Sequence, residues 1–347
     1  MSWHGHRIFS HNWCAHQKRM NPIFCDNGVV KAMKIENTLQ SGHGRRRGSC
    51  KKSLHQKQCC SDNTDSARVS RAGIAVFKIE NVKAGTMETA RISIGIDSIA
   101  TDLRAGLTAA RRLGVRGVEF DARHGLGADE LSQTGIRQIR KWLLDEGLVA
   151  VALRFRTRRG YADPDALDAR VEATKRLMQS AHGLGAPLLL NHIGDIAPTS
   201  DAAEWQLLID VLTDIGAWGQ RVGTMLAAEA GRSSPEDLAR VIESLPAGSL
   251  ACDLVTGALA VHGHDPVQSV ATLGTHVATV HLTDAIAGAF AGRGRAVKLG
   301  TGHVEVPAVL AALEERSYRG WFGIESINHG TDGVSEVTET IDFLRRL

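Results

Sequence analysis

The feature that most constrains this chain is a repeated alternation of strand-like and helix-like patterns that begins near residue 91. A short apolar or alternating run is followed, after a turn, by a segment with apolar residues at helical spacing, and this unit recurs to the C-terminus. The strand-like runs are 92–96, 117–121, 149–155, 187–192, 224–229, 250–253, 277–280 and 318–326. The helical segments are 102–113, 131–146, 165–182, 201–218, one that begins at Ser234-Pro235, 265–273, 307–316 and 335–345.

Eight strand–helix units over about 250 residues are typical of a (β/α)8 TIM barrel. The competing architecture, a doubly wound open sheet, carries a Gly-x-Gly-x-x-Gly turn after its first strand. The corresponding turn here runs from Asp97 to Asp102 and contains no glycine. We therefore predict an α/β fold with a closed barrel over residues 91–347.

Residues 1–90 have a different composition. They hold 15 Lys and Arg against 6 Asp and Glu, whereas the rest of the chain holds 26 against 32, so the net charges are +9 and −6. Five of the six cysteines precede residue 61, but the adjacent pair Cys59-Cys60 has no second pair at the spacing of a zinc module. A basic run at 45–47 is compatible with nucleic-acid contact, although a solvated tail is the commoner explanation. We predict a poorly ordered, basic, Cys- and His-containing extension.

Composition also limits the location and the partners of the protein. No apolar run approaches the roughly 18 residues that span a membrane, and the N-terminus lacks the pattern of a secretory signal. Cys252 is the one cysteine after residue 90, which suits a reducing cytoplasm. The negative net charge of residues 91–347 disfavours a nucleic-acid surface. We predict a soluble cytoplasmic protein with no membrane or nucleic-acid partner.

Four ionisable residues stand at the ends of the last four strand-like runs: Glu229, Asp253, His281 and Glu325. In a parallel barrel these ends ring a single pocket, so the four side chains would meet at one mouth. Three carboxylates in one pocket repel each other unless a cation compensates them. Each residue alone has a structural explanation, but the four together favour a site. Oxygen-rich ligation with one imidazole suits Mn²⁺, Mg²⁺ or Co²⁺, and Zn²⁺ is also compatible.

Several motifs resemble those of the xylose-isomerase-like barrel superfamily, which contains sugar and sugar-phosphate isomerases and epimerases and also endonuclease IV. They are Ala228-Glu229-Ala230, Cys252-Asp253-Leu254, Val280-His281-Leu282-Thr283-Asp284, Leu299-Gly300-Thr301-Gly302 and Tyr318-Arg319-Gly320-Trp321 followed by Glu325. In the ketose-epimerase branch the equivalent Glu, Asp, His and Glu hold one divalent metal ion. The resemblance implies that Glu229 and Glu325 also act as acid/base groups on opposite faces of a small carbohydrate substrate.

The resemblance is looser for the residues that bind substrate. Many epimerases of the superfamily carry a histidine three residues after the metal aspartate, where this sequence has Thr256. Arg293 and Arg295 are candidates for a substrate-binding arginine, and His192 is a candidate at the end of the fourth strand. Four arginines between positions 154 and 159 are compatible with an anion site, but the pattern favours a solvated basic loop.

The sequence thus predicts a divalent-metal-dependent isomerase or epimerase of a small sugar, sugar phosphate or related hydroxy-carbonyl compound, with proton transfer through an enediolate. Two alternatives stay open. One is a barrel that binds a sugar without catalysis, because a fold alone does not establish an activity. The other is a phosphodiesterase of the endonuclease IV type, although its additional histidine ligands are missing at the matching positions. Barrels of this superfamily are often dimers or tetramers, so a homo-oligomer is also compatible.

Overall fold

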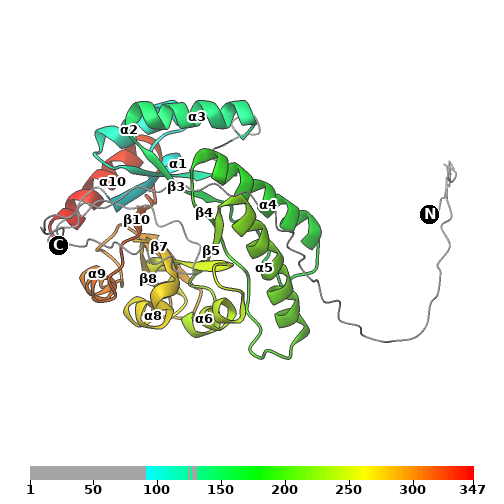
Figure 1. Cartoon of the computed structure of the whole chain (residues 1–347). Coiled ribbons are helices and arrows are strands. Elements are labelled where there is room, and N and C mark those ends of the chain that lie inside the picture. Colours follow the sequence, from blue (N-terminus) through cyan, green and yellow to red (C-terminus); the bar gives the residue numbers. More distant parts are fainter. Residues whose placement is uncertain (1–90, 124–125, 127–130) are drawn as a thin grey trace, which may run out of the picture. The chain divides into compact units, whose positions relative to one another are not determined.

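The computed structural model describes residues 91–123, 126 and 131–347, and within them the strand-like runs form a closed barrel of eight parallel strands (Figure 1). The order around the barrel is β1-β10-β7-β6-β5-β4-β3-β2. These strands are β1 (Ile92–Gly95), β2 (Gly117–Asp121), β3 (Val149–Arg154), β4 (Leu188–Asn191), β5 (Met225–Ala230), β6 (Leu250–Val255), β7 (Val277–His281) and β10 (Trp321–Ile324). The predicted barrel is confirmed. The predictions for residues 1–90 lie outside the described residues.

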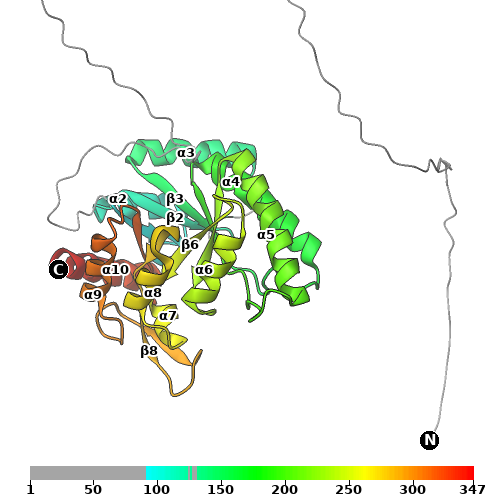
Figure 2. The same cartoon turned by 60° about the horizontal axis from the view of Figure 1, so that its bottom comes forward.

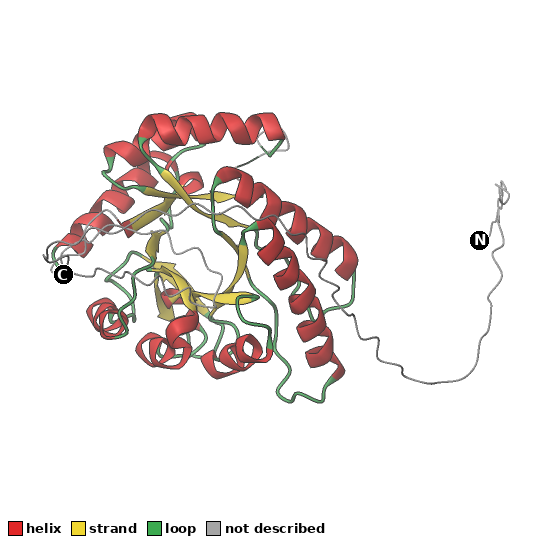
Figure 3. Cartoon of the chain, viewed as in Figure 1, coloured by secondary structure: helices red, strands yellow, loops and turns green. Residues whose placement is uncertain are grey.

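Helices cover the outside of the barrel, so the strands form an inner ring within an outer ring of helices (Figure 3). The helices are α2 (Leu103–Arg112), α3 (Gln133–Glu146), α4 (Leu167–Leu184), α5 (Ala203–Val222), α6 (Pro235–Ser244), α8 (Pro266–Leu273), α9 (Val306–Glu315) and α10 (Gly330–Arg345). The predicted start of α6 is confirmed, because the Ser234 hydroxyl accepts the backbone N–H of Asp237 at 3.1 Å. Among the described residues, no helix is long and apolar enough to cross a membrane.

Two short helices and one hairpin were not predicted. The helices are α1 (Ile96–Ile99) and α7 (Thr256–Val261), and the hairpin pairs β8 (Asp284–Ala287) with β9 (Gly294–Val297) in antiparallel register. Figure 2 shows β8 beyond the helical ring, next to α7. The sequence pattern indicated a loop here because the stretch is rich in glycine and arginine, and in the structure residues 294–296 are exposed. Asp284 anchors the base of the hairpin by accepting the backbone N–H groups of Gly300 at 3.0 Å and Gly302 at 2.7 Å.

The barrel interior contains a small apolar layer that supports the mouth. Val151, Leu190, Ala227 and Ala251 form a buried cluster of their own, separate from the large core between strands and helices. Side chains two positions apart along a strand point to the same face. The residue two positions after Ala227 is Glu229, and the residue two positions after Ala251 is Asp253. Both carboxylates therefore stand directly above this layer, toward the C-terminal ends of the strands.

Candidate functional site

The barrel register brings the four predicted site residues to one mouth. Glu229 and Asp253 are Cα partners on β5 and β6, and His281 of β7 is the partner of Gly323 on β10. Glu325 follows the last residue of β10. Because β5, β6, β7 and β10 are consecutive around the barrel, the four side chains form one continuous arc.

His281 lies between two carboxylates at the buried end of this arc. Its Nδ1 is 2.7 Å from Asp253 Oδ1 and its Nε2 is 2.8 Å from Glu119 Oε2, and all three side chains are buried. Burial alone would lower the pKa of His281, but the charges of Asp253 and Glu119 outweigh burial and raise this pKa well above its ordinary value. With both flanking carboxylates ionised, each ring nitrogen carries a hydrogen and donates it to a carboxylate oxygen.

Glu119 on β2 is a site residue that the sequence analysis missed. Its Oε1 accepts the Ser93 hydroxyl at 2.7 Å, and its Oε2 faces His281. Burial works to raise its pKa, but the charges of His281 and Arg154 prevail and lower it. Position 323, which faces His281 and Glu119, must be glycine for lack of space. A Cβ on Gly323 would lie 2.6 Å from the His281 ring and 2.9 Å from Glu119 Oε1. The sequence did contain a signal for this site residue, because Glu119 is an acidic residue in the middle of the short β2 run.

Two arginines of the β3 end occupy the open part of the mouth. The buried guanidinium of Arg154 donates to Glu325 through Nη1 and to Asp97 through Nη2. Arg156 donates from Nε to Glu229 Oε1 at 2.6 Å, and its Nη2 is 3.4 Å from Glu325 Oε1. One guanidinium thus bridges the two glutamates that were predicted to be acid/base groups. The prediction of a solvated basic loop is wrong for these two arginines, because their carboxylate partners lie on strands distant in sequence.

These contacts set the charge states of the mouth. Burial would raise the pKa of Glu325, but the positive charges of Arg154 and Arg156 outweigh it and lower this pKa to about 2. Burial also raises the pKa of Asp253, here to about 6, and His281 offsets only part of this effect. Glu325 is therefore fully ionised at neutral pH, and Asp253 takes up a proton more readily than Glu325 does.

A buried hydrogen-bond network fixes the loop that carries Arg156. The side-chain oxygen of Asn191, the last residue of β4, accepts the backbone N–H of Thr157 at 3.0 Å. The Asn191 amide donates to the Tyr161 hydroxyl at 2.8 Å. Farther along the loop, a Cβ on Gly160 would lie 2.2 Å from the Cα of Gly194, so the loops after β3 and β4 touch through their backbones. The backbone that directly follows Arg156 is thus held by buried contacts.

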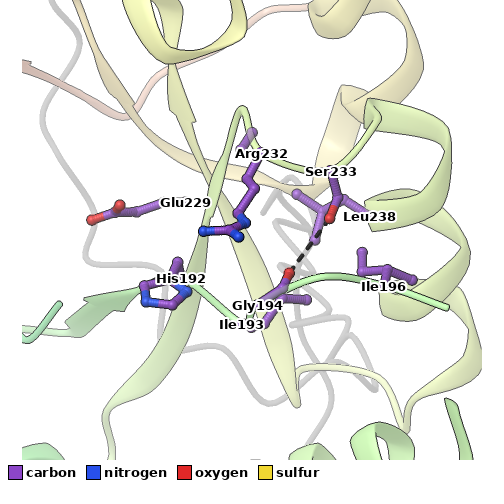
Figure 4. A pocket seen from close by; sticks show the side chains of 9 residues that line it. His192, Ile193, Gly194, Ile196, Glu229, Arg232, Ser233 and Leu238 are labelled. Carbon is purple, nitrogen blue, oxygen red and sulfur yellow. Dashed lines mark hydrogen bonds between the residues drawn. The ribbon is translucent and has the colours of Figure 1, made fainter. Parts of the chain in front are cut away.

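The three predicted substrate-binding residues lie in different places. His192 shares a pocket with Glu229 and Arg232, and Figure 4 shows these three side chains gathered at one end of it. The Nε2 of His192 faces the Thr157 carbonyl, and its Nδ1 is buried without a hydrogen-bond partner among the described residues. Arg293 and Arg295 are exposed on the β8–β9 hairpin, and within the described structure neither side chain has a hydrogen bond or ion pair with the mouth.

The donor atoms at the mouth do not fit a divalent ion as they are arranged. The described residues contain no group of three or more His, Cys, Asp and Glu side chains placed to hold a metal ion. Asp253 Oδ2 is buried without a hydrogen-bond partner, so one oxygen is available. The other predicted ligands face protein cations or, in the case of His281, present N–H groups. Metal ligation by Glu229, Asp253, His281 and Glu325 therefore stays a prediction.

Solved structures with the same fold are numerous, and three illustrate the range. A xylose isomerase domain protein from Planctomyces limnophilus is 21% identical, with 74% of this chain and 95% of that chain covered and a TM-score of 0.66. An L-ribulose 3-epimerase is 17% identical, with 74% of this chain and 93% of that chain covered and a TM-score of 0.58. A xylose isomerase-like TIM barrel protein from Mycobacterium smegmatis in complex with magnesium is 18% identical, with 76% of this chain and 97% of that chain covered and a TM-score of 0.60.

At these identities the structural likeness shows the fold alone. No curated protein matches the sequence significantly. The family model described as xylose isomerase-like TIM barrel matches residues 107–347, which is most of the chain and includes every residue of the mouth except Asp97 and Ser93. The chain therefore belongs to the xylose isomerase-like TIM barrel family.

Proposed function

We propose that this protein is an isomerase or epimerase of a small sugar, sugar phosphate or related hydroxy-carbonyl compound, located in the cytoplasm. The observation that carries the proposal is the pair Glu229 and Glu325, which approach a shared guanidinium from strands β5 and β10. This arrangement puts a carboxylate on either side of any substrate that binds over Arg156. The family includes a structural relative named as an L-ribulose 3-epimerase, which supports the same reaction class.

The chemistry requires a base near the carbon-bound proton and a positive group on the oxygen that becomes negative. In the absence of substrate each glutamate forms an ion pair with an arginine, and this pairing lowers the basicity of the carboxylate. A substrate whose carbonyl and neighbouring hydroxyl oxygens accept N–H groups from Arg156 would release both carboxylates from Arg156, while Glu325 keeps its contact with Arg154. Release weakens the effect that holds the Glu325 pKa at about 2, and its basicity rises where the proton must be removed.

The proton then moves in one of two ways. In isomerisation, one glutamate takes the proton from the carbon next to the carbonyl and returns it to the former carbonyl carbon, while the hydroxyl proton on that neighbouring carbon passes to the former carbonyl oxygen. In epimerisation, one glutamate removes the proton and the other delivers a proton to the opposite face of the same carbon. A divalent ion, as the resemblance implies, would stabilise the same enediolate. Because the donor set does not fit such an ion as arranged, both routes are derived from the chain's own residues.

A second function, sugar binding without catalysis, is favoured by one observation. Both glutamates are neutralised by arginines, as in a site that holds a polar ligand but does not move protons. Solvent exchange separates the two functions. An enzyme that forms an enediolate incorporates deuterium from D₂O at the carbon next to the carbonyl, and a binding protein does not.

The experiment is proton NMR of a panel of ketoses, aldoses and their phosphates, incubated in D₂O with the purified full-length chain. We expect at least one compound to lose its carbon-bound proton signal. Glu229→Gln and Glu325→Gln should each reduce that rate by roughly 10²-fold or more, because the amide keeps the shape but removes the basicity. Glu339→Gln, a change at an exposed helix position, is the control. Unchanged exchange in both site variants would remove the glutamates from the mechanism, and no exchange in the whole panel would favour the binding function.

A further inference from the structure

Three carboxylates at the mouth of the barrel contact guanidinium groups of the protein itself, and Arg154 and Arg156 supply all of these contacts. The three are Asp97, Glu229 and Glu325. The positive charge beside these carboxylates therefore comes from side chains of the protein.

Arg156 lies between Glu229 and Glu325, where an ion shared by the Oε1 atoms of both carboxylates would lie. It approaches Oε1 of both carboxylates, at 2.6 Å and 3.4 Å. A divalent ion bound by the same two oxygens would need each of them at about 2.1 Å. Guanidinium and metal ion would then compete for the same lone pairs while repelling each other. Occupation by one excludes the other.

Several features keep the Arg156 guanidinium at this position. Arginine stays charged at all ordinary pH values, so a pH change does not displace it. The Asn191 network holds the loop immediately after it, and the buried Arg154 anchors Glu325 from the other side. A metal ion that entered would have to move a side chain whose neighbours are fixed.

We propose that Arg156, supported by Arg154, takes the place of the divalent ion at this mouth, so that guanidinium groups bind the oxygen atoms of the substrate. The second half of this statement rests on the proposed function, and the first half does not. The parallel N–H groups of a guanidinium match two oxygens held side by side. An α-hydroxy-carbonyl group presents such a pair, and so does the enediolate formed from it.

The test measures binding of Mn²⁺ alone to the full-length chain after treatment with a chelator and its removal. Titration calorimetry gives the Kd, and electron paramagnetic resonance gives the amount of free Mn²⁺. Arg156→Ala removes the bridging guanidinium and frees Glu229, which lies near the unpartnered Asp253 Oδ2, while Glu325 keeps its contact with Arg154. We expect this variant to bind about one Mn²⁺ at least tenfold more tightly than the wild type, a gain of about 1.4 kcal/mol. Arg158→Ala, an exposed arginine of the same loop, is the matched control and should behave as the wild type.

Two results of the Mn²⁺ titration would overturn the proposal. One is tight binding of one Mn²⁺ by both the wild type and Arg156→Ala, and the other is no binding by either protein. The Arg156 side chain is 42% exposed, so its truncation leaves the core intact. Circular dichroism checks the fold, and Arg156→Gln provides a second variant of the same kind.

Deuterium exchange separates this proposal from the proposed function. Exchange by the wild type in the presence of a chelator supports both. Exchange that appears only after Mn²⁺ is added overturns the arginine proposal and leaves the isomerase or epimerase function standing. Because Mn²⁺ affinity is measured without substrate, the gain in Arg156→Ala is readable even if no substrate in the panel reacts.

Discussion

Replacement of Glu119 by Gln should destabilise the barrel strongly, because it removes one of the two negative charges that hold His281 in its protonated form. Glu119 and His281 are each about 1% exposed, and Nε2 is 2.8 Å from Glu119 Oε2. The glutamine amide can still bond to His281 and Ser93, so the loss is the charge rather than the contact. Breaking a buried pair by removing one partner costs about 3–5 kcal/mol, and we expect about 3 kcal/mol because the shape is kept.

The measurement is urea denaturation of wild type and variant, followed by circular dichroism, together with the thermal midpoint. For a domain of this size, 1 kcal/mol corresponds to about 2–4 °C, so the midpoint should fall by roughly 6–12 °C. Glu339→Gln is the control, since its pair with Lys298 is exposed and its loss should not be measurable.

A loss in Glu119→Gln no larger than in the control would refute the reasoning, because His281 would then not depend on this carboxylate. Nitrogen-15 NMR of the histidine side chains gives an independent reading. In the wild type both nitrogens of His281 should be protonated at neutral pH. A neutral ring with one unprotonated nitrogen would contradict the charge state that the two flanking carboxylates imply.

Three further predictions concern positions that support the site. Gly323→Ala should cost about 2 kcal/mol in denaturant, because the added Cβ meets the His281 ring at 2.6 Å; a neutral result would show that the ring can shift. Asn191→Leu should cost about 2 kcal/mol by leaving the buried Thr157 N–H unpaired, whereas an unchanged midpoint would mean that another acceptor replaces it. Burial raises the pKa of Tyr161 and Tyr318, the only tyrosines of the chain, above their unfolded value of about 10. The neutral phenols therefore stabilise the fold below about pH 10, and this stabilisation is lost as the pH rises further. Tyrosinate absorbance at 295 nm should increase together with unfolding, and its appearance in the folded protein near pH 10 would contradict the burial argument.

The architecture and the arc of four residues were predictable from the sequence. Strand and helix patterns are local, because they follow from which face of each segment is buried, and eight repeats leave few folds to choose from. The cap at Ser234 was readable for the same reason. Glu229, Asp253 and His281 were identified because a polar residue that ends an apolar run is visible without knowing its neighbours.

The contacts of those residues depend on the closure of the barrel. His281 meets Glu119 across 162 positions of sequence, and Arg154 meets Glu325 across 171. Both contacts arise only because β1 pairs with β10 and β2, which closes the ring and brings the first strands beside the last. No local pattern distinguishes an arginine that faces solvent from one that points into the mouth. Closure of the barrel therefore places Arg154 and Arg156, from an arginine-rich stretch, beside the carboxylates of the mouth.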